Sequence, residues 1–99
     1  MNNLAKRTVD ELMRVIVPHQ TREAMGWDTN TALAMTVDGT SKTVTLNAAV
    51  NGNDGVLCHM DEYCRITLPK AVREIANISA KDVLTFKADA ASGMLVMCN

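Results

Sequence analysis

The sequence predicts a mainly β protein with two short α-helices, folded as one compact domain from two similar halves. Three observations support this fold class. The chain resembles itself at an offset of 51 residues, apolar and polar residues alternate in several segments, and a proline opens one short helical segment in each copy. Ninety-nine residues with 47% apolar content are enough for one small core. We therefore expect residues 1–99 to form a single pseudo-twofold domain.

The internal repeat aligns residues 10–46 with residues 61–97 without a gap. Identical pairs are Asp10/Asp61, Glu11/Glu62, Arg14/Arg65, Pro18/Pro69, Arg22/Arg73, Glu23/Glu74, Leu33/Leu84, Asp38/Asp89 and Ser41/Ser92. Apolar pairs such as Val15/Ile66 and Trp27/Ile78 keep the buried positions in step. We assign repeat 1 to residues 1–46, a turn-rich linker to 47–55 and repeat 2 to 56–99. Each repeat is too short to bury a sufficient core alone, so each is expected to need the other.

Each repeat begins with strands and continues into a helix. In repeat 1 we expect strands at 4–9 and 14–17, joined by a turn at 10–13. Pro18 then opens a helix over 19–25, because the first helical turn does not need the proline N–H. The helix is expected to end at Gly26, which tolerates a left-handed backbone. Repeat 2 is expected to follow the same plan, with a strand at 64–68 and a helix over 70–76 that ends at Asn77.

A hairpin is expected to complete each repeat. In repeat 1, Leu33, Met35 and Val37 alternate with smaller or polar residues, and a turn at 38–41 leads to a returning strand with Val44 and Leu46. In repeat 2 the corresponding apolar residues are Leu84, Phe86, Leu95 and Met97, around a turn at 89–93. Two such units bury their apolar faces only against one another, which predicts a compact, pseudo-dimeric β-barrel. Trp27 is expected to be in the core.

Composition excludes several classes of function. The net charge is −1 and aromatic residues make up 3%, which argues against a polybasic domain and against single-strand binding by stacked rings. No segment has the apolar length of a signal peptide or a membrane span, so we expect a cytoplasmic protein. Cys58, Cys64 and Cys98 match no disulfide or zinc pattern, and we expect reduced thiols and neither a metal nor a cofactor.

An ordered set of residues occurs in both repeats: Asp-x-x-x-Arg, then apolar-x-apolar-Pro, then x-x-x-Arg. It resembles the DNA-binding unit of the AbrB/SpoVT transcription factors. The resemblance implies a swapped-hairpin barrel, which two chains normally build and which one chain would supply here, as in MraZ-like proteins. The family often has glycine before the first arginine, where this chain has Met13 and Cys64. Either the turn differs at these positions or the two residues accept a strained backbone.

Seven basic residues form the candidate binding site. We expect the four repeated arginines to lie on one face, because the guanidinium fork can pair bidentately with guanine or phosphate. The set is Arg14, Arg22, Arg65, Arg73, Arg7, Lys6 and Lys70. Arg14 and Arg65 can also bridge to Asp10 and Asp61, which would fix their direction. Acidic residues nearby leave an excess of one positive charge, so non-specific affinity for DNA is expected to be modest.

These observations lead to one function and two alternatives. We expect a sequence-specific, duplex DNA-binding transcriptional regulator, associated with the nucleoid, and not an enzyme, because no catalytic constellation is present. The first alternative is a MazE-like antitoxin that binds its own operator and a toxin partner; we expect it less, because such antitoxins usually add a disordered tail and the last predicted strand here runs to the end of the given sequence. The second is a small β-barrel assembly module without DNA binding, which the near-neutral charge favours. Exposed strand edges would also allow a homo-oligomer.

Overall fold

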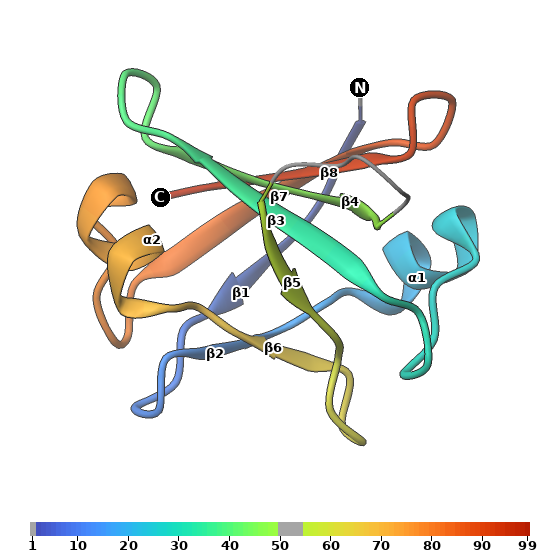
Figure 1. The fold of residues 1–99 in the computed structure, drawn as a ribbon, viewed down its shortest axis with the longest axis horizontal. Coiled ribbons are helices and arrows are strands. Elements are labelled where there is room, and N and C mark those ends of the chain that lie inside the picture. Colours follow the sequence, from blue (N-terminus) through green and yellow to red (C-terminus); the bar gives the residue numbers. More distant parts are fainter. Residues whose placement is uncertain (1, 50–54) are drawn as a thin grey trace.

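The same run of elements occurs twice along the chain (Figure 1). The computed structural model describes residues 2–49 and 55–99. Repeat 1 contains β1 (Asn2–Thr8), β2 (Arg14–Ile16), α1 (His19–Met25), β3 (Leu33–Asp38) and β4 (Thr43–Ala48). Repeat 2 contains β5 (Val56–Cys58), β6 (Arg65–Thr67), α2 (Lys70–Ala76), β7 (Val83–Asp89) and β8 (Met94–Cys98).

Both helices begin and end at the residues that the sequence predicts. Pro18 and Pro69 precede them, and Gly26 and Asn77 end them in the left-handed region, with φ of 70° and 59°. The strands differ slightly from expectation. β6 starts at Arg65 and not at residue 64, because Cys64 belongs to the preceding turn with a φ of 61°. β4 extends through residue 48, into the expected linker, of which residues 50–54 lie outside the described part of the chain.

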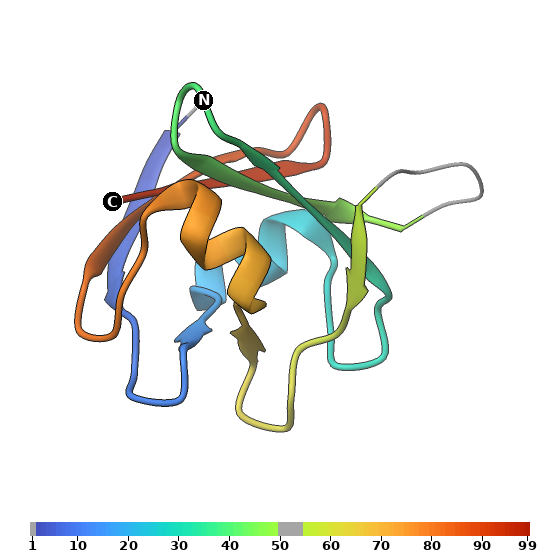
Figure 2. The same cartoon turned by 60° about the vertical axis from the view of Figure 1, so that its left-hand side comes forward.

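The first strand of each repeat pairs with the hairpin of the other repeat. β1 joins β7, and β5 joins β3, within one antiparallel six-stranded sheet of order β1-β7-β8-β4-β3-β5 (Figures 1 and 2). β2 and β6 pair only with each other, in a separate two-stranded ribbon. The mainly β class with two helices is confirmed. The expected β-barrel is not closed, because β1 and β5 remain sheet edges and the β2–β6 ribbon does not join them.

The register of the sheet follows from the alternation of apolar residues. Met35 lies opposite Leu46, Leu46 opposite Leu95, and Leu95 opposite Ala88. This row crosses β3, β4, β8 and β7, and all four side chains are buried. A slip of one residue in any of these strands would turn its apolar side chains to the opposite face. The register is therefore determined by burial.

One core serves both repeats. Val15 and Ile66 lie opposite each other in the β2–β6 ribbon, and both are fully buried beneath the sheet. Trp27 is also buried, as predicted, and its counterpart Ile78 is too. Figure 2 shows the two helices between the sheet and the turns that flank the ribbon. The ribbon and the helices thus cover one face of the six-stranded sheet.

The repeats differ at one polar position inside this core. Thr21, on α1, is fully buried, and its hydroxyl has no hydrogen-bond partner in the described part of the chain. The counterpart of Thr21 in repeat 2 is the buried Val72. A buried hydroxyl without a partner costs about 1–3 kcal/mol of stability. Valine has nearly the same shape and removes that cost.

We expect Thr21→Val to raise the free energy of unfolding by about 1 kcal/mol, because it removes an unsatisfied buried hydroxyl. Urea denaturation followed by circular dichroism measures the change. The reverse substitution, Val72→Thr, is the matched control and should destabilise the protein. A loss of stability in Thr21→Val would show that the hydroxyl has a partner in solution.

Candidate nucleic-acid interface

An aspartate organises the turn before each strand of the ribbon. Oδ1 of Asp10 accepts hydrogen bonds from the backbone N–H groups of Leu12 and Arg14, at 2.9 and 2.8 Å. Oδ2 of Asp10 accepts from Nε of Arg14 at 2.8 Å. The same carboxylate thus shapes the turn and directs the arginine.

The turn of repeat 2 has the same arrangement. Asp61 accepts from the backbone N–H groups of Tyr63 and Arg65, at 2.8 and 2.9 Å, and from Nε of Arg65 at 2.8 Å. The bridges between Asp10 and Arg14 and between Asp61 and Arg65, considered from the sequence, are both present. Because a carboxylate and a guanidinium bond strongly, these bridges restrict the direction of the two arginines.

Of the two alternatives for Met13 and Cys64, the structure has the second: the turn forms, and both residues adopt a strained backbone. Their φ angles are 62° and 61°, in the left-handed region, which costs a residue with a Cβ about 1–2 kcal/mol. The carbonyl of Met13 accepts from the N–H of Leu68, and that of Cys64 accepts from the N–H of Val17, both at 2.9 Å. Each strained residue therefore bonds to the strand of the other repeat, just beyond the end of the ribbon.

The outer face of the ribbon presents two arginines. Arg14 lies opposite Thr67 and Arg65 lies opposite Ile16, while the pair between them points into the core. Arg14 and Arg65 are diagonal neighbours, a relation that corresponds to about 7–8 Å between strand positions. Both arginine side chains are about one quarter exposed, at 27% and 24%. The prediction that the repeats bring these two residues to one face agrees with this placement.

The helical arginines lie at the two ends of the same ribbon. Nε of Arg22 donates to the carbonyl of Val17 at 3.1 Å, and Nε of Arg73 donates to the carbonyl of Leu68 at 2.9 Å. These carbonyls follow the last residues of β2 and β6, at opposite ends of the antiparallel pair. We call the set of Arg73, Arg14, Arg65 and Arg22, in that order along the ribbon, the arginine row.

All four arginines of this row use Nε for their internal bond. In the described part of the chain, none of their Nη atoms has a hydrogen-bond partner. Arg22 and Arg73 are held by neutral carbonyls, so their charge is not offset by an ion pair there. The row thus presents four oriented guanidinium forks.

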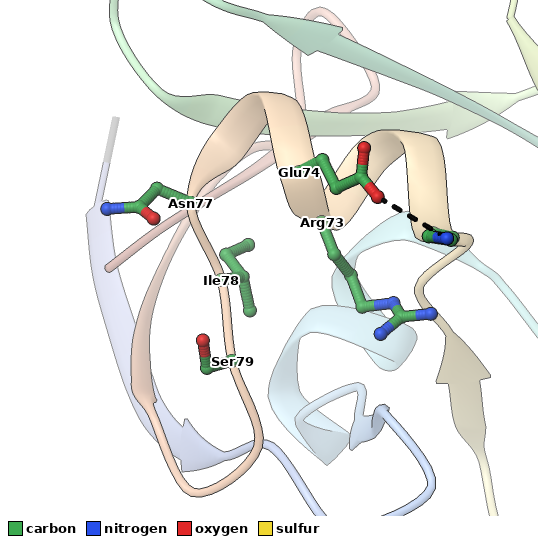
Figure 3. Close-up of a pocket in the computed structure, with 6 residues that line it drawn as sticks. Arg73, Glu74, Asn77, Ile78 and Ser79 are labelled. Carbon is green, nitrogen blue, oxygen red and sulfur yellow. Dashed lines mark ion pairs between the residues drawn. The ribbon is translucent and has the colours of Figure 1, made fainter.

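The three other predicted basic residues are placed differently from one another. Arg7 lines a hollow of about 500 Å³ together with Pro18 and His19 at the start of α1. Lys70, at the start of α2, lines a second hollow of about 460 Å³ with Arg73 and is 3.8 Å from Glu74 (Figure 3). Lys6 precedes Arg7 on β1, so its side chain points to the opposite side of that strand. The structure therefore brings Arg7 and Lys70, but not Lys6, to the helical flanks of the row.

Figure 3 shows how Arg73 lies in the second hollow. Its side chain extends from α2 away from Asn77, and the carboxylate of Glu74 points toward the lysine at the helix start. His19 and Glu23 form the corresponding pair on α1, with 2.7 Å between Nε2 and Oε1. The helical glutamates thus pair along their own helices and leave the arginine forks free.

The turn aspartates remain ionised over a wide pH range. The backbone N–H of Arg14 is the main cause that lowers the pKa of Asp10, and the Arg14 side chain and the N–H of Leu12 add to it. For Asp61, burial opposes ionisation, but the backbone and side chain of Arg65 and the N–H of Tyr63 outweigh it and lower the pKa. At neutral pH both carboxylates therefore hold their arginines.

Sequence reasoning missed the residues at the turn tips. Tyr63 is 64% exposed, and the guanidinium carbon of Arg65 lies 4.8 Å from the centre of its ring. Leu12 takes the same place in the other turn and is 66% exposed. The signal was present in the sequence, because the third position of each turn differs between the repeats while the aspartate and arginine around it are identical.

The described residues were compared with the patterns of a metal site, a disulfide and a membrane-spanning helix. No cluster of three or more His, Cys, Asp or Glu side chains in residues 2–49 and 55–99 has the arrangement of a metal site. The three cysteines are free thiols, and burial raises the pKa of Cys58. No described helix is both long and apolar enough to cross a membrane.

Comparisons with known proteins show the fold and nothing more specific. No family model matches the chain, and no curated protein matches it. The solution structure of PHS018 from Pyrococcus horikoshii is similar, with a TM-score of 0.53 and 21% sequence identity. The match covers 98% of this chain and 90% of that one. Both repeats are therefore included in the shared fold.

We expect the double variant Asp10→Asn/Asp61→Asn to be less stable than the natural protein at pH 7, because it loses both arginine bridges. The folded-state pKa values of both aspartates are lowered, so their stabilisation is present above about pH 4 and is lost as the pH falls through the folded values. Unfolding free energies measured from pH 7 to pH 2 should therefore fall more steeply for the natural protein. Glu11→Gln, in the same turn, is the control. Parallel pH profiles for the natural protein and the double variant would contradict the bracing role.

Proposed function

We propose that this protein binds duplex DNA in a sequence-specific manner through the arginine row, as a transcriptional regulator of the AbrB/SpoVT type. The observation that carries the proposal is the anchoring of all four arginines by Nε, which leaves each Nη fork free. The row follows a two-stranded ribbon, and a ribbon of this kind fits the width of the DNA major groove, about 12 Å.

The chemistry of the forks favours a nucleic-acid partner. A guanidinium fork pairs bidentately with O6 and N7 of guanine or with two phosphate oxygens. The forks are fixed before binding, so less conformational entropy is lost when they meet their partner. Arg7 and Lys70 lie beside α1 and α2, where they would contact the phosphates that flank the contacted bases.

The repeated sequence pattern supports the same function. Each repeat carries the aspartate, the two arginines and the proline that resemble the AbrB/SpoVT unit. The pairing of β1 with β7 and of β5 with β3 agrees with the strand exchange that this resemblance implies. A chain with both halves would act as the equivalent of a dimer and would need no second copy to complete the row.

The charge of the chain limits how strongly it is expected to bind DNA of arbitrary sequence. A net charge of −1 for the whole chain gives little long-range attraction to DNA. Affinity for arbitrary sequences should therefore be modest, and discrimination should depend on the oriented forks and on DNA shape.

We expect Arg14→Ala and Arg73→Ala each to weaken binding by roughly tenfold or more, because each removes one bidentate contact of about 1–3 kcal/mol. Anisotropy titrations with genomic fragments that the protein itself selects would measure the loss. Lys87→Ala is the matched control: Lys87 is exposed on β7, between the inward-facing Phe86 and Ala88, and so points away from the ribbon. Thermal unfolding of each variant checks that the fold persists.

Affinity should also fall with salt, by about 0.9 in log affinity per log unit of salt for each phosphate contacted. Unchanged affinity in both arginine variants would refute the proposed site. A lack of binding to any genomic fragment at low salt would refute the function and favour an assembly module.

A further inference from the structure

The two ends of the ribbon are related by the internal repeat but are chemically unlike. One end, which we call the Tyr63 end, combines the β5–β6 turn with α1, and the other, the Leu12 end, combines the β1–β2 turn with α2 (Figure 1). Each end has one ribbon arginine braced by an aspartate and one helical arginine held by a carbonyl. The arginine row is thus nearly symmetric, while the side chains around it are not.

The turn tips show the clearest difference. Tyr63 carries a hydroxyl that donates and accepts hydrogen bonds, and its ring contacts the guanidinium of Arg65 at 4.8 Å. Leu12 offers only apolar contact, and no ring lies against Arg14 in the described part of the chain. Both tips are about two-thirds exposed, so both are free to touch a partner that covers the ribbon.

The helix starts extend the difference. At the Tyr63 end, Arg7, His19 and Gln20 surround one hollow. At the Leu12 end, the positions equivalent to Arg7 and Gln20 are Cys58 and Ala71, which carry no charge and no amide. Lys70 takes the place of His19 at the Leu12 end, and the Tyr63 end still offers more side-chain N–H and O–H donors, through Arg7, Gln20 and Tyr63.

We propose that the protein binds its duplex in a single orientation, on a target whose two half-sites differ in sequence, with Tyr63 and Leu12 as the specificity-determining residues of the two ends. This inference rests on the proposed DNA-binding function. A dimer of identical chains has equal ends, so its two orientations on a site have equal energy. Here the ends are unlike and covalently joined, and the two orientations differ by their unequal contacts.

The side chains of Tyr63 and Leu12 indicate which base pairs each end of the ribbon would prefer. The hydroxyl of Tyr63 discriminates between base pairs by the donors and acceptors at their edges, while Leu12 favours the methyl group of thymine. The base positions under the arginines should be related by two-fold symmetry, because the arginines are. The positions under the turn tips should not.

Selection from a pool of duplexes with a randomised central segment tests the inference. The expected consensus has symmetric positions under the arginine row and unlike bases under the turn tips. Two artificial palindromes, each made by doubling one half of this consensus, should bind roughly tenfold more weakly than the asymmetric duplex, because each mismatched position costs about that much. A palindromic consensus would overturn the inference and leave the proposed function standing. A failure to select any duplex would overturn both.

The exchanged variant Leu12→Tyr/Tyr63→Leu gives an independent test. Selection with this variant should exchange the base preferences under the two tips. Tyr63→Phe is the matched control, because it keeps the ring over Arg65 and removes the hydroxyl; it should lose the preference at that end only. An unchanged consensus in the exchanged variant overturns the role of both tips, and an unchanged consensus in Tyr63→Phe overturns the role of the hydroxyl. Thermal unfolding should change little, since both side chains are exposed.

Discussion

The pairing of β2 with β6 is the interaction on which the rest of the structure depends. Each strand has only three residues, so neither is stable without the other. Their inner pair, Val15 and Ile66, is fully buried, and the ribbon is extended at both ends by bonds from Leu68 to Met13 and from Val17 to Cys64. Those two acceptors are the strained turn residues. The backbone strain of each turn is thus offset by hydrogen bonds to the other repeat, which keeps the two halves together.

The same contacts that hold the fold also orient the candidate binding groups. Asp10 and Asp61 each close a turn with backbone hydrogen bonds and hold an arginine with the remaining oxygen. Arg22 and Arg73 bond to the carbonyls that follow the ribbon strands. Because the ribbon positions all four anchors, their direction follows from strand pairing and not from flexible surface side chains. Duplication in one chain adds a further consequence: surface positions such as Leu12 and Tyr63 can differ while the anchors stay equal.

Local signals predicted the helices and turns well, and long-range pairing was harder to predict. The helix α1 begins after Pro18 and ends at Gly26, as expected. The missing N–H of proline and the left-handed backbone of glycine are properties of the single residue, so the sequence alone predicts them. The start of β6 was misplaced by one residue, because Cys64 has a left-handed backbone, with a φ of 61°, which the residue type alone does not predict. The seven basic residues were predicted as one group, yet Lys6 points to the other side of β1 from Arg7, a consequence of alternation along that strand. The exposed turn tips were overlooked because their one sign in the sequence, the difference between Leu12 and Tyr63 within turns that share an aspartate and an arginine, does not show that either side chain is exposed.

The sequence by itself determined the repeat, the two helices with their ends, the buried register of the hairpins and the identity of the bracing aspartates. Each of these depends on residues that are close along the chain or on a regular alternation of apolar positions. The family resemblance had implied an exchange of strands between the repeats, and the tertiary structure gives its partners, β1 with β7 and β5 with β3. Only the tertiary structure decided that the sheet stays open at β1 and β5 and that the four arginines follow one ribbon. These features depend on which distant strand supplies each hydrogen-bond partner, and two nearly equal repeats offer equivalent partners that only the packing of one shared core can distinguish.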